Sequence, residues 1–162
     1  MGYLLDANVF IQAKNLHYGF DFCPAFWDWI DHAHTVGLVH SVESVRAELI
    51  AGDDPLAEWA KRRGDGFFLI PDQASISSLQ AVSTWAYSAG YEPAAVPTFL
   101  QGADYYLVAQ AHALQLTVVT HELFSNSTKR IKIPNACLEL NVRFVNPFAM
   151  LRTERARFVI GS

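Results

Sequence analysis

The sequence predicts a three-layer α/β/α fold, in which a parallel sheet of about five strands is covered by helices on both faces. Short apolar segments alternate along the chain with longer amphipathic ones, which is the pattern of consecutive strand–helix–strand units. The first short segment lies within residues 3–11. Its three residues before Asp6 are all apolar, as expected for a strand buried on both faces. Asp6 then stands at the carboxyl end of this strand, where open parallel sheets carry their functional groups.

Composition sets the broad class of the protein. A chain of 162 residues is expected to form a single domain, residues 1–162, with a substantial core, and 51% hydrophobic against 17% charged residues excludes disorder. The apolar segments are far too short to span a membrane and no secretory signal is recognisable, so a cytoplasmic protein without a membrane partner is expected. Cys23 and Cys137 are then expected to be reduced thiols. The net charge of −4 argues against nucleic-acid binding, unless several carboxylates converge on one pocket where cations neutralise them.

Strands and helices are expected in alternation. Besides the strand before Asp6, short runs rich in apolar and β-branched residues predict four strands, at residues 38–40, 67–70, 117–120 and 143–146. Apolar residues at helical spacing predict helices at residues 24–37, 41–50, 55–64, 72–88, 103–114 and 134–140, with a last turn from Pro147. Residues 15–21, 90–102 and 121–132 are expected to be irregular, apart from one helical turn at 98–100.

Several helix starts carry a recognisable signal. Pro24 and Pro55 suit the first turn of a helix, where the missing N–H has no partner to lose. Ser41 is predicted to cap the helix that follows the second strand, and Gly52 to end that helix. Asp72 is predicted to cap the long helix that follows the third strand.

Acidic residues follow two of the predicted strands. Asp6 comes directly after the first strand, and Glu122 comes one residue after the fourth. If these two strands are neighbours at the point where the strand order reverses, both carboxylates face one crevice. A turn residue that merely closes the strand is an equally good explanation of Asp6 taken alone.

Two further acidic positions lie on predicted helices. Asp104 opens the 103–114 helix on its apolar side, where a carboxylate is uncommon unless it caps the helix, pairs with a cation or binds a metal. The 41–50 helix offers Glu43 in its first turn, where the helix dipole favours an anion, and Glu48 in its last turn, where the dipole disfavours one. Helical geometry alone does not decide between these two glutamates.

These residues together resemble a PIN-domain nuclease. The resemblance is carried by residues 5–9 (LDANV), Ser41 with the Glu48-Leu49 pair, Asp104 opening an alanine-rich helix, and residues 119–124 (VTHELF). Residues 132–137 (KIPNAC) resemble an uncharacterised PIN subgroup with its own C-terminal segment. The resemblance implies an acidic metal site made of the following residues: Asp6, Glu48, Asp104 and Glu122. It implies supporting roles for Asn8, Ser41 and Thr120. One residue departs from the family pattern, because Glu122 stands where an Asp is usual.

Carboxylates of this kind suit Mg²⁺ or Mn²⁺, which prefer carboxylate and water oxygens. Two like charges about 5 Å apart repel by ~3 kcal/mol at an effective dielectric constant of ~20. Four converging carboxylates would form six such pairs, so the cluster needs one or two metal ions or must take up protons. A water activated by the metal would attack the phosphodiester bond, and the resemblance implies a 5′-phosphate and a 3′-hydroxyl as product ends.

Residues after the fourth strand are candidates for substrate binding. His121 could approach a substrate beside Glu122, although a solvated loop histidine is the simpler interpretation. Lys129, Arg130 and Lys132 form a basic cluster that suits RNA phosphates and suits a solvated loop equally well. Tyr105 and Tyr106 could stack on a base, but packing explains them more simply. Four aromatic residues at helical spacing are expected in the core: Phe26, Trp27, Trp59 and Trp85.

The function predicted from the sequence is a Mg²⁺- or Mn²⁺-dependent endoribonuclease that cleaves single-stranded RNA. The resemblance and the size of the chain further suggest the toxin of a toxin–antitoxin pair, with an antitoxin protein and a second copy of the chain as partners. The alternative is a PIN-fold module that binds RNA or a protein with weak or no catalysis. A haloacid-dehalogenase-type phosphatase is disfavoured, because it needs a second Asp where this chain has Asn8.

Overall fold

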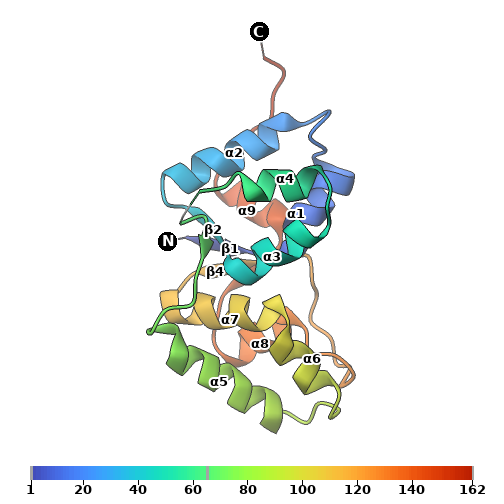
Figure 1. The fold of residues 1–162 in the computed structure, drawn as a ribbon, viewed down its shortest axis with the longest axis vertical. Helices are drawn as coiled ribbons and strands as arrows, with labels where there is room; N and C mark the ends of the chain where they lie inside the picture. The colour runs from blue at the N-terminus through green and yellow to red at the C-terminus, as the bar shows by residue number, and fades with distance from the viewer. Residues whose placement is uncertain (1, 65, 162) are drawn as a thin grey trace.

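The centre of the computed structural model is a five-stranded parallel sheet with the strand order β3-β2-β1-β4-β5 (Figure 1). The structure describes residues 2–64 and 66–161. Its strands have the following bounds: β1 Tyr3–Leu5, β2 Val39–Val42, β3 Phe68–Leu69, β4 Thr117–Val119 and β5 Phe144–Val145. Every neighbouring pair is parallel, so the predicted sheet is confirmed.

Strands β1 and β4 are neighbours at the centre of the sheet, as the crevice hypothesis requires. Leu5 is paired with Val119, and the backbone N–H of Asp6 donates to the carbonyl of Val119 at 2.9 Å. The order reverses between these two strands, because β2 and β3 lie on one side of β1 and β4 and β5 lie on the other. The chain segments that leave β1 and β4 therefore begin side by side at the carboxyl edge of the sheet.

Helices cover both faces of the sheet. In Figure 1, α1, α2, α4 and α9 lie above the sheet and α5 to α8 lie below it, while α3 lies where the two layers meet. The helices have the following bounds: α1 Ala7–Gln12, α2 Pro24–Thr35, α3 Glu43–Ala51, α4 Pro55–Lys61, α5 Ser75–Ser88, α6 Ala95–Gln101, α7 Ala103–Leu114, α8 Ile133–Glu139 and α9 Pro147–Thr153. A π-helical turn, η1 (Ala13–His17), continues α1. None of the helices within residues 2–64 and 66–161 is long and apolar enough to cross a membrane.

The chain becomes helical directly after Asp6, which was not predicted from the sequence. Val9, Phe10 and Ala13 are buried from one side of α1 and η1, so the apolar run after Asn8 follows helical rather than strand spacing. A run of three apolar residues is too short for periodicity to separate these alternatives. The expected loop at 15–21 consequently starts later, after His17.

The prediction that Ser41 caps a helix is wrong. Strand β2 continues through Val42, and α3 begins at Glu43 with Val42 at its N-cap position. The Ser41 hydroxyl is buried and donates to the carbonyl of Leu5 at 2.6 Å, so it ties β2 to the end of β1 beside Asp6. The β propensity of the flanking valines outweighs the capping preference of the serine.

Two other helix boundaries differ from the prediction. Helix α6 makes two turns where one turn was expected, because Ala95, Val96 and Phe99 bury an apolar side. Helix α5 begins at Ser75 rather than at Asp72, although Asp72 accepts hydrogen bonds from the backbone N–H and the hydroxyl of Ser75.

The aromatic core forms in the layer above the sheet, largely as predicted. Phe26, Trp27 and Trp59 are buried, and the rings of Trp27 and Trp59 pack edge to face with 5.0 Å between centroids. Trp85 is partly buried, packs against the edge of the hydrophobic core and contacts the ring of Tyr91.

Candidate active site at the carboxyl edge of the sheet

Asp6 is held in a hydrogen-bond network that joins β1 to the residues after β4. The hydroxyl of Thr120 donates to Asp6 Oδ2 at 2.8 Å and accepts from the side-chain amide of Asn8 at 3.4 Å and from the backbone N–H of Glu122 at 3.0 Å. Asn8 Oδ1 in turn accepts from the backbone N–H of His121 at 3.2 Å. Asn8 and Thr120 therefore lie where supporting residues were predicted, and they fix the orientation of the Asp6 carboxylate.

The Asp6 carboxylate is poorly solvated, since only 4% of the residue is exposed. Burial raises the pKa of Asp6 to about 8, with smaller contributions in the same direction from Asp104 and Glu122, while the hydrogen bond from Thr120 opposes the shift. An anion at this position is therefore costly unless a cation or a proton accompanies it. A simple turn aspartate would not have carboxylates from two other elements in range.

Asp104 enters the site from the first turn of α7. Its pKa is raised to about 6, first by burial and then by the charges of Glu122 and Glu48, while Arg130 and Lys132 act in the opposite direction. Capping does not explain this residue, because Gly102 occupies the N-cap position of α7 and no side chain caps the helix. Asp104 is therefore a second carboxylate that lies in the same electrostatic environment as Asp6.

The structure separates the two glutamates of α3. Glu48 lies within the electrostatic range of Asp104, lines the same pocket, and has a pKa that is raised by the partial burial of its carboxyl group. Glu43 instead lines a different pocket beside Arg46 and Arg63. The two residues are five positions apart on one short helix, so only the docking of α3 against α7 distinguishes them.

Glu122 lies close to the other acids, but other groups already hold its carboxylate. Glu122 Oε1 accepts from the backbone N–H of Ile133 at 2.9 Å, at the start of α8, and Oε2 lies 3.6 Å from a guanidinium nitrogen of Arg130. The longer side chain reaches the start of α8, which an Asp at this position would not reach as easily. Glu122 therefore adds negative charge to the site and also anchors the loop at 121–132.

The donor set matches a hard divalent cation in its chemistry. Asp6, Asp104, Glu48 and Glu122 offer only carboxylate oxygens, and the raised pKa values of the first two show that their charges are poorly compensated by the protein. Among residues 2–64 and 66–161, however, no three His, Cys, Asp or Glu side chains lie close enough to form a finished metal shell. The side chains would have to draw together around an ion, and the Thr120 network already orients one of them.

A pocket of about 520 Å³ adjoins the acids on the side of α6 and α7. Glu48 and Asp104 lie on its wall together with Lys129, Arg130 and Phe99. Two of the three residues of the predicted basic cluster therefore line the pocket, and the third, Lys132, acts electrostatically on Asp104. Negative and positive side chains meet here, as a site that binds both a cation and phosphate groups requires.

The aromatic surroundings of His121 were not predicted from the sequence. The imidazole is half-buried, stacks on His17 with 5.7 Å between ring centroids and lies 5.8 Å from Phe148, so the expectation of a solvated loop histidine is wrong. Burial and then His17 lower the pKa of His121. No local pattern connects these three residues.

Tyr105 and Tyr106 pack as expected, and the Tyr105 hydroxyl donates to the carbonyl of Leu79.

Cys137 is a further residue near the acids. The thiol is buried, and burial together with the negative charge of Asp6 raises its pKa to about 12. It therefore remains a neutral apolar neighbour of Asp6 rather than a nucleophile or metal ligand. Both cysteines are free thiols, as predicted.

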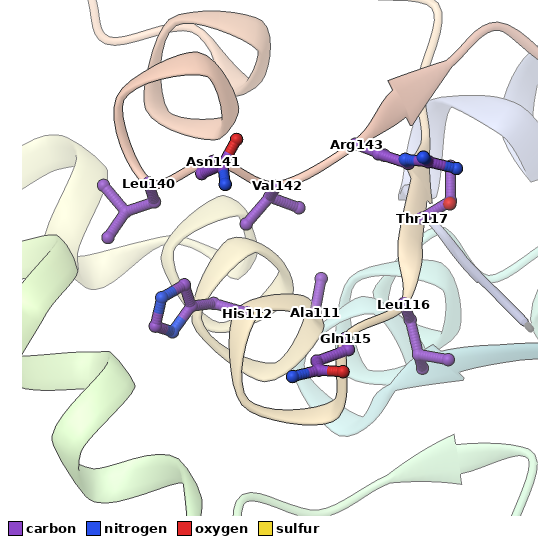
Figure 2. A pocket seen from close by; sticks show the side chains of 9 residues that line it. All are labelled: Ala111, His112, Gln115, Leu116, Thr117, Leu140, Asn141, Val142 and Arg143. Carbon is purple, nitrogen blue, oxygen red and sulfur yellow. The ribbon is translucent and has the colours of Figure 1, made fainter.

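A second pocket lies at the opposite edge of the sheet. Figure 2 shows it between the end of α7, the start of β4 and the turn between α8 and β5. Its volume is about 560 Å³, and it is lined by Ala111, His112, Gln115, Leu116, Thr117, Leu140, Asn141, Val142 and Arg143. None of the predicted site residues belongs to this set.

Comparison with known proteins confirms the fold. Among solved structures, the chain is similar to VapBC2 from Rickettsia felis bound to a DNA fragment from their promoter (TM-score 0.53, 16% identity) and to FitAcB from Neisseria gonorrhoeae (TM-score 0.55, 21% identity). Each match covers 90% of this chain and 98% of the other. Both structures contain PIN-domain proteins, so the predicted PIN-like fold is confirmed. No curated protein matches the sequence. A family model matches residues 3–158, and the chain therefore belongs to the family described as Domain of unknown function (DUF4411).

Proposed function

We propose that this protein is a Mg²⁺- or Mn²⁺-dependent endoribonuclease that hydrolyses single-stranded RNA. The observation that carries the proposal is the convergence of Asp6 and Asp104, two poorly solvated carboxylates whose pKa values are raised to about 8 and about 6. Perturbed carboxylates that converge at the switch point of a parallel sheet are typical of functional sites. The adjoining pocket with Lys129 and Arg130 supports a substrate that carries phosphate groups.

Each residue has a distinct role in the proposed reaction. Asp6, Asp104 and Glu48 would hold the metal, and Thr120 would keep Asp6 in one orientation through its 2.8 Å hydrogen bond. A bound Mg²⁺ or Mn²⁺ would supply an activated water as the nucleophile and positive charge for the leaving oxygen. Lys129 and Arg130 would bind the phosphates that flank the scissile bond, and Glu122 would hold the loop that carries them through its bond to Ile133.

Partners follow from the fold likeness. The two similar solved structures are toxin–antitoxin complexes, which supports a toxin role with an antitoxin protein as partner. The proposal also includes a homodimer, in which a second copy of the chain is the partner. Light scattering would test it by measuring the molar mass of the protein in solution. It also places the protein in the cytoplasm, because free thiols suit a reducing compartment.

The test is cleavage of single-stranded RNA by the purified protein with Mn²⁺. Chelator should stop the reaction, and Asp6→Ala should remove cleavage while RNA binding persists. RNA with 2′-O-methyl groups should still be cut wherever it binds, because the proposed nucleophile is a water molecule and not the 2′-hydroxyl. Products with a 2′,3′-cyclic phosphate, or cleavage that survives both chelator and Asp6→Ala, would overturn the proposal.

A second candidate is a PIN-fold module that binds RNA or a protein without effective catalysis. One observation favours it: the Glu122 carboxylate is bonded to Ile133 and paired with Arg130, so it is less free to bind metal than the Asp usual in the family would be. RNA binding without metal-dependent cleavage, and with no gain of activity in Glu122→Asp, would favour this candidate.

A further inference from the structure

Three aromatic rings from distant parts of the chain meet beside the acidic site. His17 ends the π-helical turn η1, His121 follows β4, and Phe148 is the second residue of α9. His17 lies 5.1 Å from Phe148 in an edge-to-face arrangement and 5.7 Å from His121 in a stacked one, and His121 lies 5.8 Å from Phe148 (centroid distances). We call these three residues the aromatic cluster.

The aromatic cluster is attached to the same edge of the sheet as the carboxylates. His121 stands between Thr120 and Glu122, and its backbone N–H donates to Asn8 Oδ1, inside the network that orients Asp6. Phe148 follows β5, the neighbour of β4, and His17 is reached from Asp6 through α1 and η1. The cluster is therefore linked to Asp6 through the hydrogen bonds that join the ends of β1 and β4.

The cluster and the basic pocket draw on helices from different layers of the fold. The pocket with Lys129 and Arg130 is lined by residues of α6 and α7, helices that lie below the sheet in Figure 1, while Phe148 belongs to α9, a helix that lies above it. A strand of RNA with a phosphate at the acids could therefore contact both the basic residues and the rings.

The rings of the cluster remain partly exposed, unlike those of the core. His17, His121 and Phe148 are each half-buried, whereas Phe10 and Phe26 have no exposed surface. Aromatic faces that remain accessible beside a phosphate-binding site are suited to stacking on unpaired bases.

We propose that the aromatic cluster stacks on a base of single-stranded RNA next to the scissile phosphate. This inference rests on the proposed function, because it names how the substrate of that site is held. Stacking needs a base that is free of its neighbours, so the cluster selects single-stranded over double-stranded RNA. It tolerates any base sequence, since every base presents a π face.

The test measures binding in chelator, so it does not depend on cleavage. A short single-stranded RNA carries one 2-aminopurine, placed in turn at each position, and its fluorescence reports stacking. Wild-type protein should quench the probe strongly at one position. Phe148→Ala and His17→Ala should each remove this quenching and weaken single-stranded affinity by about 5-fold or more.

Three controls separate stacking from folding. Phe148→Trp should retain quenching and affinity, whereas Phe148→Leu, which keeps apolar bulk but removes the ring, should lose quenching. Tyr87→Ala removes an exposed aromatic residue of α5, 71% exposed and outside the cluster, and should bind like the wild type. Thermal melts identify any variant that fails to fold, in which case His17→Ala alone decides.

The outcomes distinguish this inference from the proposed function. Position-specific quenching that depends on Phe148 and His17 would support the cluster even if no cleavage is found with Mn²⁺, which would overturn only the ribonuclease. Metal-dependent cleavage combined with unchanged quenching and affinity in folded Phe148→Ala and His17→Ala would overturn the cluster alone. Absence of quenching by the wild type at every probe position would also overturn it.

Discussion

The two edges of the sheet carry pockets of similar size and different chemistry. The pocket at the carboxyl edge, about 520 Å³, is bordered by Glu48, Asp104, Lys129 and Arg130. The pocket at the amino edge, about 560 Å³, has only His112 and Arg143 as ionisable lining residues (Figure 2). His112 is already bonded through Nδ1 to the hydroxyl of Ser78 at 2.7 Å.

This difference shows that volume alone does not identify a site. At the carboxyl edge, burial and then the charges of neighbouring carboxylates raise the pKa values of Asp6 and Asp104, so an anion at these positions is costly without a cation or a proton. At the amino edge, the lining residues are the ends of helices and the starts of strands, where the chain changes direction. Gln115 and Asn141 both have a φ of 56° there, as residues that end helices commonly do.

The largest effect should come from removing the partly buried charge of Asp104 at the carboxyl edge. Asp104→Asn should lower Mn²⁺-dependent cleavage by at least ~100-fold, because Asp104 is proposed to bind the metal directly. Residues that only support a metal ligand usually cost about 10- to 100-fold when they are removed. It should also raise the melting temperature of the metal-free protein, because the neutral amide at this position would no longer repel Asp6, Glu48 and Glu122. Each kcal/mol of stability gained should raise the melting temperature by about 2–4 °C. Scanning calorimetry with and without Mn²⁺ tests the stability, and the cleavage assay tests the activity. A melting shift on adding metal that matches the wild type would exclude Asp104 as a ligand.

The pH dependence of stability should report Asp6. Its pKa is raised to about 8, so between about pH 4 and pH 8 the folded protein keeps a proton that the unfolded chain has released. The free energy of unfolding without metal should therefore fall as pH rises through this range, by on the order of a few kcal/mol. Urea denaturation at a series of pH values measures this. Asp6→Asn should flatten the upper part of the profile.

The two glutamates of α3 provide a matched pair. Glu48→Gln should reduce cleavage by about 10- to 100-fold, because Glu48 lies beside Asp104, and Glu43→Gln should stay within about twofold of the wild type. Both substitutions remove one carboxylate from the same helix, although the helix dipole favours an anion at Glu43 in the first turn and disfavours one at Glu48 in the last. Equal activities of the two variants would show that α3 contributes no specific ligand.

The basic residues should affect RNA binding more than chemistry. Lys129→Ala combined with Arg130→Ala should make the salt dependence of single-strand affinity shallower by about 1.4 in the log–log slope, or ~0.7 for each phosphate that is no longer neutralised. Removal of the Arg130–Glu122 pair should change stability by less than about 1 kcal/mol, since the Arg130 side chain is 65% exposed. Fluorescence anisotropy at several salt concentrations measures the slope, and an unchanged slope would remove these residues from the RNA path.

The smallest effect is expected at the amino edge. Arg143→Ala should leave cleavage and RNA affinity within about twofold of the wild type and stability within about 0.5 kcal/mol, because Arg143 is exposed and remote from the acids. The same cleavage and anisotropy assays apply. A loss of activity as large as that of Glu48→Gln would show that both edges take part in the function.

The order of the elements and the main acidic positions could be predicted from the sequence. Uniformly apolar strands, prolines at helix starts and the placement of Asp6 and Asp104 are local features, and local patterns predict local structure. The pairing of β1 with β4 was only a condition of the crevice hypothesis, and the strand order of the folded sheet shows that it is met. The helix at Ala7–Gln12 could not be predicted from the sequence, because a short apolar run fits a strand and a helix equally well.

What each side chain contacts depended on the tertiary structure. Glu48 and Glu43 lie on one short helix, and the packing of α3 against α7 puts Glu48 in the pocket of Asp104 and Glu43 in another. Ser41 could cap a helix or bond to a neighbouring strand, and the pairing of β2 with β1 decides for the strand. The three rings of the aromatic cluster come together from three separate segments of the chain, and no periodicity in the sequence encodes such a contact, because it arises from where the sheet places the chain ends.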